Sequence, residues 1–221
     1  MNHTGCFLCR TPTKAFLCRT CTRQLDYWRG FRGRSRYKGY PLWFVAPYAG
    51  AVRDRLWELK YKGATHLAPG LGHLMAATYL EESRSLPDWL VPMPMGPTRE
   101  GNRGFNQSRL LAVAMGRLLD RPVADLLVRK DTRSLAQHQG ALREGVLRGS
   151  MKTVCGKVGR KDRILVIDDI HTTGATLREA IRALETQGFT EVGFLFFARQ
   201  EMSDNLVKWF SLEKGLEGGL W

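Results

Sequence analysis

Residues 163–177 (RILVIDDIHTTGATL) constrain the fold of this chain more than any other stretch. Residues 164–167 are apolar and rich in β-branched side chains, and the run is too short for a buried helix. This pattern is typical of a central parallel strand that is buried on both faces. Asp168 and Asp169 follow the run, so we expect them to mark the end of the strand, with exposed carboxylates.

A helix and a second strand are expected after the acids. Apolar residues recur at helical spacing over 177–184, Gly188 is a suitable stop, and 189–198 form an apolar run. The connecting turn is rich in hydroxyl groups and consists of Thr172, Thr173, Gly174, Ala175 and Thr176. Free backbone N–H groups and the helix dipole favour a phosphate there, and Gly174 lets the backbone approach it.

The two acids lie ahead of this predicted phosphate site, at the carboxyl edge of the sheet. There Asp168 and Asp169 could accept hydrogen bonds from a ribose diol. We therefore predict a cradle for a ribose phosphate. The alternative is an ordinary strand and helix cap whose acids are solvated.

The pattern Asp-Asp-x-x-Thr-Thr-Gly-x-Thr over residues 168–176 resembles the PRPP-binding motif of type I phosphoribosyltransferases. The resemblance implies an α/β fold with a parallel sheet flanked by helices. It also implies that the acids hold the ribose hydroxyls and that the turn holds the 5′-phosphate.

The composition is that of a globular protein with an unusually basic charge. Of 221 residues, 43% are hydrophobic and 25% are charged, which excludes disordered and fibrous classes. No apolar run approaches the ~20 residues of a membrane span, and the first residues lack the hydrophobic core of a signal peptide, so a cytoplasmic protein is expected. The formal net charge of +13 attracts polyanions, above all nucleic acid and more weakly acidic lipid.

Four cysteines near the N-terminus form two CxxC pairs separated by eight residues: Cys6 with Cys9, and Cys18 with Cys21. Four thiolates on two short knuckles suit tetrahedral Zn²⁺ in a structural role. A redox CxxC normally occurs once, and paired disulfides are disfavoured in a reducing cytosol. Cys155 stands alone and is expected to be a small hydrophobe.

Residues 1–40 carry most of the excess charge, with nine basic side chains against one acid. Aromatic residues are interleaved with these bases at Tyr27, Trp28, Phe31, Tyr37 and Tyr40. Such a basic aromatic arm could stack on unpaired bases while its cations follow the backbone. Alternatively it is a solvated linker whose aromatics pack on the knuckle or the core.

The remaining sequence predicts further elements of the main domain. We expect strands over 43–48 and 88–92 and helices over 52–60, 66–82 and 107–119, and an irregular loop forced by prolines after residue 92. Lys60 could meet a phosphate or simply end its helix. Arg99 and Arg103 lie at a junction suited to a diphosphate, or merely flank Asn106 as a helix cap.

Three segments together resemble the ComF family, also called GntX-like and amidophosphoribosyltransferase-like. They are Val-Pro-Met-Pro at 91–94, Arg-Gly-Phe-Asn-Gln at 103–107 and the acid motif at 168–176. The four cysteines and Leu-Lys-Tyr at 59–61 agree. The resemblance implies a cytoplasmic protein of natural competence or DNA utilisation that acts on incoming single-stranded DNA, with a helicase partner in some relatives.

Residues 128–143 resemble the family's Arg-x-x-x-Thr-x-x-Gln segment, which would cover the site as a mobile hood. The family continues with an Asn where Val146 stands here. A short hairpin is expected over 153–158. The predicted organisation is a zinc knuckle and basic arm over 1–40, a phosphoribosyltransferase-like domain over 41–200, and a tail over 201–221.

Two functions remain open. In the first, the chain is a Mg²⁺-dependent phosphoribosyltransferase whose Arg99, Arg103 and Lys60 hold the pyrophosphate of PRPP, although no residue stands out as a base for the acceptor. In the second, it binds PRPP without turnover and handles single-stranded DNA. We expect a competence-associated PRPP-binding protein; the alternatives are a salvage enzyme and a PRPP-sensing regulator.

Overall fold

The computed structural model describes residues 5–32, 34–131, 149–154 and 156–200, apart from the side chains of residues 29–34. The predictions for Gln137, Arg143, Val146 and Cys155, and for the tail 201–221, therefore lie outside the described residues. No helix within the described ranges has the length and apolar character that a membrane crossing requires.

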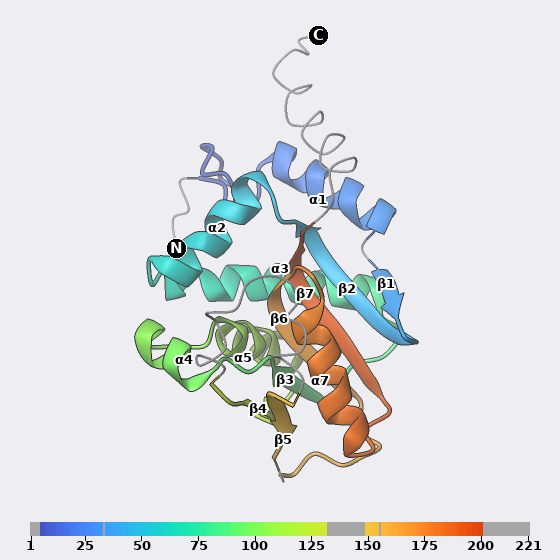
Figure 1. Ribbon diagram of the computed structural model, residues 1–221. Coiled ribbons are helices and arrows are strands. Elements are labelled where there is room, and N and C mark those ends of the chain that lie inside the picture. Colours follow the sequence, from blue (N-terminus) through green and yellow to red (C-terminus); the bar gives the residue numbers. More distant parts are fainter. Residues whose placement is uncertain (1–4, 33, 132–148, 155, 201–221) are drawn as a thin grey trace.

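A five-stranded sheet forms the centre of the molecule (Figure 1). Its strands, in spatial order, are β1 (Arg34–Tyr37), β2 (Tyr40–Pro47), β7 (Val192–Arg199), β6 (Ile164–His171) and β3 (Trp89–Pro92). The last four are parallel to one another, and β1 pairs with β2 in the antiparallel sense. The four parallel strands therefore end at one edge, which is where α/β sheets bind ligands.

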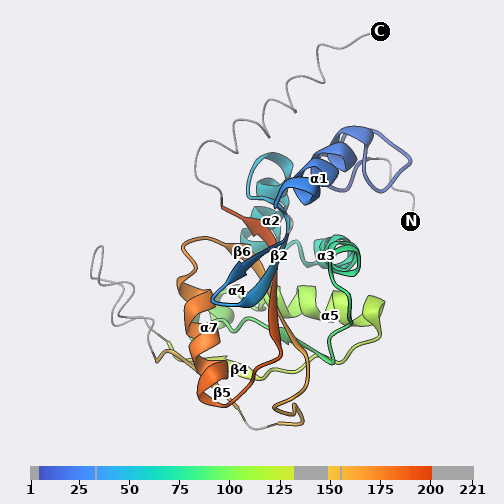
Figure 2. The ribbon, with the colours of Figure 1, turned by 90° about the vertical axis from the view of Figure 1, so that its right-hand side faces the viewer.

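Helices cover both faces of the sheet, as Figure 2 shows with α7 on one side and α3 and α5 on the other. They are α1 (Arg19–Arg32), α2 (Gly50–Tyr61), α3 (Ala68–Glu82), α4 (Pro97–Arg103), α5 (Gln107–Leu119) and α7 (Ala175–Thr186), with a 3₁₀ turn at Thr65–Leu67. Neighbouring strand residues belong to opposite cores: Ile167 packs with α3 and α5, and Val166 packs with α7. The continuous apolar runs thus reflect burial on both faces, as predicted.

Strand β6 extends further than expected. It runs to His171, because its pairing with the eight-residue β7 continues through Asp168↔Phe196 to His171↔Arg199. The prediction that the acids end the strand with exposed carboxylates was wrong. Asp168 and Asp169 are 8% and 3% exposed, respectively.

Two further predictions need correction. Helix α4 replaces part of the expected irregular loop, because Pro97 occupies a first-turn position where proline favours a helix. The described residues of 153–158 form no hairpin; instead β5 (Met151–Thr153) pairs with β4 (Leu127–Arg129). This second sheet is fixed to α7, since Glu179 accepts a hydrogen bond from the Met151 N–H at 3.0 Å.

The N-terminal segment packs closely on the rest of the chain. Cys6, Leu8 and Leu25 belong to the same core as α3 and α5, and Trp28 is buried in the core on the α7 side. Arg55 of α2 donates a hydrogen bond to the Leu8 carbonyl at 2.9 Å. For Trp28, therefore, the packing alternative holds, and its ring is not free to stack on a base.

Candidate functional site

A cleft of about 370 Å³ opens at the carboxyl edge of the sheet. It is lined by seven of the predicted site residues, which come from four separate segments: Lys60, Arg99, Arg103, Asp168, Asp169, Thr172 and Thr176. The remaining three, Thr173, Gly174 and Ala175, complete the turn between the two threonines. Parallel topology thus brings together groups that are more than 100 residues apart in sequence.

Asp168 is a buried carboxyl with two hydrogen bonds to one oxygen. Its Oδ1 accepts from the Ser108 hydroxyl at 2.7 Å and from the Asp169 N–H at 2.9 Å. Burial, reinforced by the neighbouring charge of Asp169, raises the pKa of Asp168 to about 7. The site therefore holds a carboxyl that changes charge in the physiological range.

Asp169 is paired with Lys60 from α2. The Lys60 Nζ lies 2.9 Å from Asp169 Oδ2, and both side chains are largely buried. The contact is a close ion pair without hydrogen-bond geometry, and Oδ2 has no hydrogen-bond partner within the described part of the chain. Lys60 thus faces an acid here, and the acid retains acceptor capacity toward the cleft.

The turn after β6 has the form expected of an anion site. Gly174 precedes α7 in a left-handed conformation, with φ of 75°, and within the described residues the helix N-terminus has no side-chain cap. A Cβ at this position would lie 3.3 Å from His171 Nε2, so the turn favours glycine. The side chains of Thr172 and Thr173 are exposed beside the uncapped backbone N–H groups.

His171 lies next to this turn but carries no prediction from the sequence. Its ring meets Phe44 and Phe196 edge to face, with centroids 5.6 and 5.1 Å away. Burial, together with the charges of Arg199 and Arg178, lowers its pKa to about 4. The imidazole is therefore neutral at physiological pH.

The arginines of α4 are positioned by the segment that follows them. Gly104 ends the helix with a positive φ, and Asn106 caps α5 by accepting from the Ser108 and Arg109 N–H groups. Asn106 also donates to the Met93 carbonyl at 3.0 Å, which fixes the proline loop. The helix cap predicted at Asn106 is confirmed. It does not exclude the other alternative, because Arg99 and Arg103 also line the cleft.

Several residues that line the cleft were not predicted as site residues, and three of them bear on its chemistry. Ser108, Tyr61 and Arg129 of β4 line the cleft. Burial, together with the charge of Arg99, lowers the pKa of the Arg129 guanidinium. Asp131 fastens the start of the hood segment to α4 by accepting from the backbone and hydroxyl of Thr98. A serine two residues after a helix cap resembles an ordinary first-turn residue, so no sequence pattern marked Ser108 as part of the site.

The four N-terminal cysteines are brought together as predicted. All four are free thiols, and their sulfur atoms lie within 4.8 Å of one another. Cys6 and Cys21 are buried, whereas Cys9 is exposed. The group could hold a metal ion.

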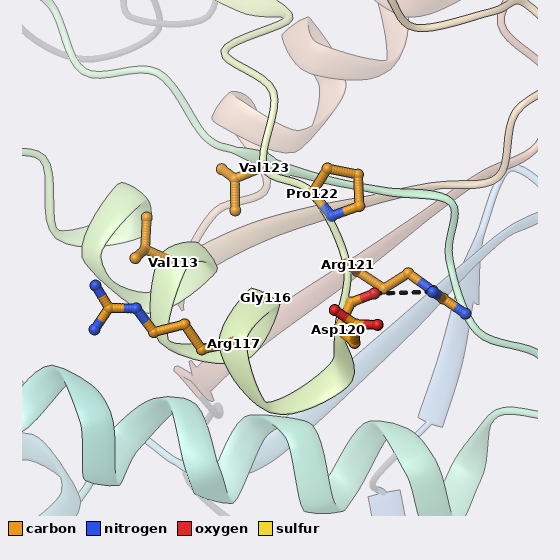
Figure 3. Close-up of a pocket in the computed structure, with 7 residues that line it drawn as sticks. All are labelled: Val113, Gly116, Arg117, Asp120, Arg121, Pro122 and Val123. Atoms are coloured by element: carbon orange, nitrogen blue, oxygen red, sulfur yellow. Dashed lines mark hydrogen bonds between the residues drawn. The ribbon is translucent and has the colours of Figure 1, made fainter.

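A second hollow, of about 450 Å³, lies at the C-terminal end of α5 (Figure 3). Its polar groups are those of Arg117, Asp120 and Arg121, and Arg121 donates to the Asp120 carbonyl at 2.8 Å. The described residues that line it include one acid, Asp120, and none at a helix N-terminus. The chemistry therefore concentrates in the smaller cleft beside β6.

A family model and several known proteins are similar to this chain. Residues 107–211 match the phosphoribosyl transferase domain model. The glutamine phosphoribosylpyrophosphate (PRPP) amidotransferase from B. subtilis, complexed with ADP and GMP, aligns with a TM-score of 0.40 and 23% identity, over 58% of this chain and 25% of that chain.

Two curated relatives are similar over about two thirds of this chain. The DNA utilization protein YhgH of Escherichia coli (strain K12) is 29% identical over 154 residues, which cover 67% of each chain. The competence protein ComFC of Bacillus subtilis (strain 168) is 31% identical over 147 residues, which cover 65% of this chain and 58% of that protein. These relatives, the phosphoribosyl transferase domain match and the four-cysteine group support the resemblance to the ComF family.

Proposed function

We propose that this chain binds PRPP and handles single-stranded DNA in natural transformation or DNA utilisation. The observation that carries the proposal is the cleft, which unites an acid pair, a hydroxyl-rich helix N-terminus and several cations. The names of the relatives, a DNA utilization protein and a competence protein, support the biological setting.

In the proposed complex the ribose diol donates hydrogen bonds to Asp168 and Asp169, and residues 172–176 hold the 5′-phosphate. The pyrophosphate lies toward Arg99 and Arg103, with Arg129 beside them. Mg²⁺ would arrive with PRPP and screen the pyrophosphate charge. Lys60 neutralises Asp169 in the unliganded site and can turn to the pyrophosphate once the diol engages the acid.

Phosphoribosyl transfer is a second candidate, favoured by the neighbourhood of Asp168. The bond between ribose C1 and the pyrophosphate oxygen would break, with its electron pair leaving on pyrophosphate, while an acceptor nucleophile bonds to C1. Cations around the leaving group stabilise that charge. A carboxyl that titrates near neutrality, as Asp168 does, is suited to accept the acceptor's proton. Pyrophosphate release with single-stranded DNA or free bases as acceptors would separate an enzyme from a PRPP sensor.

We further propose that the four cysteines bind one structural Zn²⁺. The fit is supported by four reduced sulfurs that lie within 4.8 Å of one another, the ligand set that zinc prefers. The metal would staple the knuckle onto α2, where Arg10 and Glu58 form an ion pair of 2.6 Å.

The DNA role rests on charge. The net charge of +13 favours a polyanion, and nine of the basic residues lie in the first 40 positions. Tyr37 and Tyr40 pack against the core on the α7 side, and Trp28 is buried within it. The arm would therefore attract DNA mainly by electrostatics, and a competence helicase is a candidate partner that could receive the strand.

A thermal-shift experiment tests the PRPP site. PRPP with Mg²⁺ should raise the melting temperature, because a ligand that binds only the folded state stabilises it. Asp169→Ala should remove this shift, whereas the control Asp125→Ala, an exposed acid paired with Arg109, should keep it. An unchanged shift in Asp169→Ala would refute the assignment.

A further inference from the structure

Two aromatic side chains of α2 are exposed in the part of the chain that the structure describes. Trp57 is 46% and Tyr61 is 65% exposed. They are four residues apart, so they lie on one face of the helix, and their ring centroids are 5.9 Å apart. Among the described residues, they are the only aromatic members of the exposed large hydrophobic set. Such a pair is well suited to contact a ligand.

Each ring of the pair carries a cation over it. Lys62 Nζ lies 5.1 Å from the centre of the Trp57 ring, and the Arg103 guanidinium carbon lies 5.4 Å from that of Tyr61. Arg53 lies one turn before Trp57, where it forms an exposed ion pair with Asp54. Cations thus surround the rings, and the two acids of α2, Asp54 and Glu58, are each engaged in ion pairs.

The pair is continuous with the cleft. Tyr61 lines the cleft, and so does Arg103, whose guanidinium lies over the Tyr61 ring. Lys60, next to Tyr61 in sequence, forms an ion pair with Asp169 inside the cleft. A ligand stacked on these rings would therefore lie at the mouth of the proposed PRPP site. It could extend into the cleft without moving along the surface.

We propose that Trp57 and Tyr61 form a stacking platform for an unpaired base of single-stranded DNA, with Lys62 and Arg103 on the adjoining phosphates. Stacking with cations is the chemistry by which proteins hold single strands without reading their sequence. The charge of the chain favours a nucleic acid over a neutral protein surface. The platform deepens the proposed function and rests on it, since it places the strand beside the PRPP cleft.

Binding of a labelled oligothymidylate, followed by fluorescence anisotropy at low salt, tests the platform. Trp57→Ala and Tyr61→Ala should each weaken binding by about tenfold, or about 1.4 kcal/mol, because each removes a ring on which a base stacks. Tyr61→Phe keeps the ring and should bind like wild type, whereas Tyr61→Leu keeps apolar area without a π face and should not. The matched control Leu118→Ala removes a similarly exposed side chain from α5 and should change nothing.

Salt dependence separates the two contributions. Lys62→Gln should lower the slope of log affinity against log salt by about one, whereas Trp57→Ala should leave the slope unchanged. Affinity within twofold of wild type in both alanine variants would overturn the platform, and so would a change of oligomeric state in Trp57→Ala without a change in DNA binding.

Failure of the platform and failure of the PRPP assignment give different results. Trp57 does not line the cleft, so Trp57→Ala should keep the thermal shift with PRPP. A retained shift with unchanged DNA affinity would refute the platform alone. Absence of the shift in the wild-type protein would refute the proposed function.

Discussion

The cysteine knuckle and the β6 cleft are built in opposite ways, although both contact α2. The knuckle takes its four candidate ligands from residues 6–21, a single short stretch. The cleft takes its groups from α2, α4, β6 and the turn before α7, which only the sheet brings together. A local site depends on its ligand for shape, whereas a site on a sheet edge is shaped by the core beneath it.

Removal of the metal should have the largest effect on stability, and it tests directly whether the knuckle, unlike the cleft, depends on a ligand for its shape. A chelator selective for zinc over magnesium should lower the free energy of unfolding by about 5 kcal/mol or more, because structural zinc contributes folding energy outright. Elemental analysis should first find one zinc per chain, and adding zinc back should restore the melting temperature. The PRPP shift should survive in the stripped protein, since the cleft rests on the sheet.

The comparison would fail in either of two cases. A metal-free protein with an unchanged melting temperature would show that the knuckle does not need a ligand. Loss of the PRPP shift together with the metal would show that the cleft depends on the knuckle through α2.

The pH dependence of PRPP binding should be the next largest effect. Burial raises the pKa of Asp168 to about 7, so the carboxylate that accepts the diol forms only as pH rises. Affinity measured by calorimetry should therefore increase by about tenfold per pH unit below 7. The Asp168→Asn variant should bind PRPP more weakly, and its affinity should vary with pH only as the ionisation of PRPP itself requires. An equal slope of affinity against pH in the variant and the wild type would contradict the role of Asp168 as the acceptor of the diol.

The stability of the unliganded protein should change with pH in the opposite direction, and the contribution of Asp168 to the free energy of unfolding should fall as pH rises. The folded state keeps the proton on Asp168 at pH values where the unfolded chain, with a pKa near 3.8, has lost it. This contribution is fully present below the unfolded pKa and is lost as pH rises through the folded value. Urea unfolding of wild type and Asp168→Asn between pH 4 and 8 would show it as a difference between the two curves.

Backbone substitution in the turn should give the smallest of these effects. Gly174→Ala is expected to cost about 1–3 kcal/mol, because φ is positive there and the new Cβ approaches His171 Nε2. Gly101→Ala is the matched control: it lies in α4 with nothing within 4 Å of a new Cβ, so it should be neutral or slightly stabilising. Equal urea midpoints for the two variants would contradict the claim that the backbone conformation at Gly174 requires glycine.

Sequence predicted well what neighbouring residues determine together. The β6–α7 unit, the α5 cap at Asn106 and the four-cysteine cluster each depend on a short stretch of chain, and all three are present. The α5 bounds expected at residues 107–119 are those observed.

Sequence failed where a partner far along the chain decides the outcome. β6 extends past the acids because β7 offers eight residues to pair with, and this pairing buries Asp168 and Asp169. Ser108 acquires its role only because α5 packs beside β6. The β4–β5 pairing joins segments on either side of the hood, which no local pattern marks.

The central claim is that the cleft beside β6 binds PRPP, and a crystal structure of the protein soaked with PRPP and Mg²⁺ tests it most directly. We expect density for the 5′-phosphate at the N-terminus of α7, with the ribose diol on Asp168 and Asp169 and the pyrophosphate toward Arg99 and Arg103. An empty cleft at saturating PRPP, or ligand bound instead in the hollow at the end of α5, would contradict it.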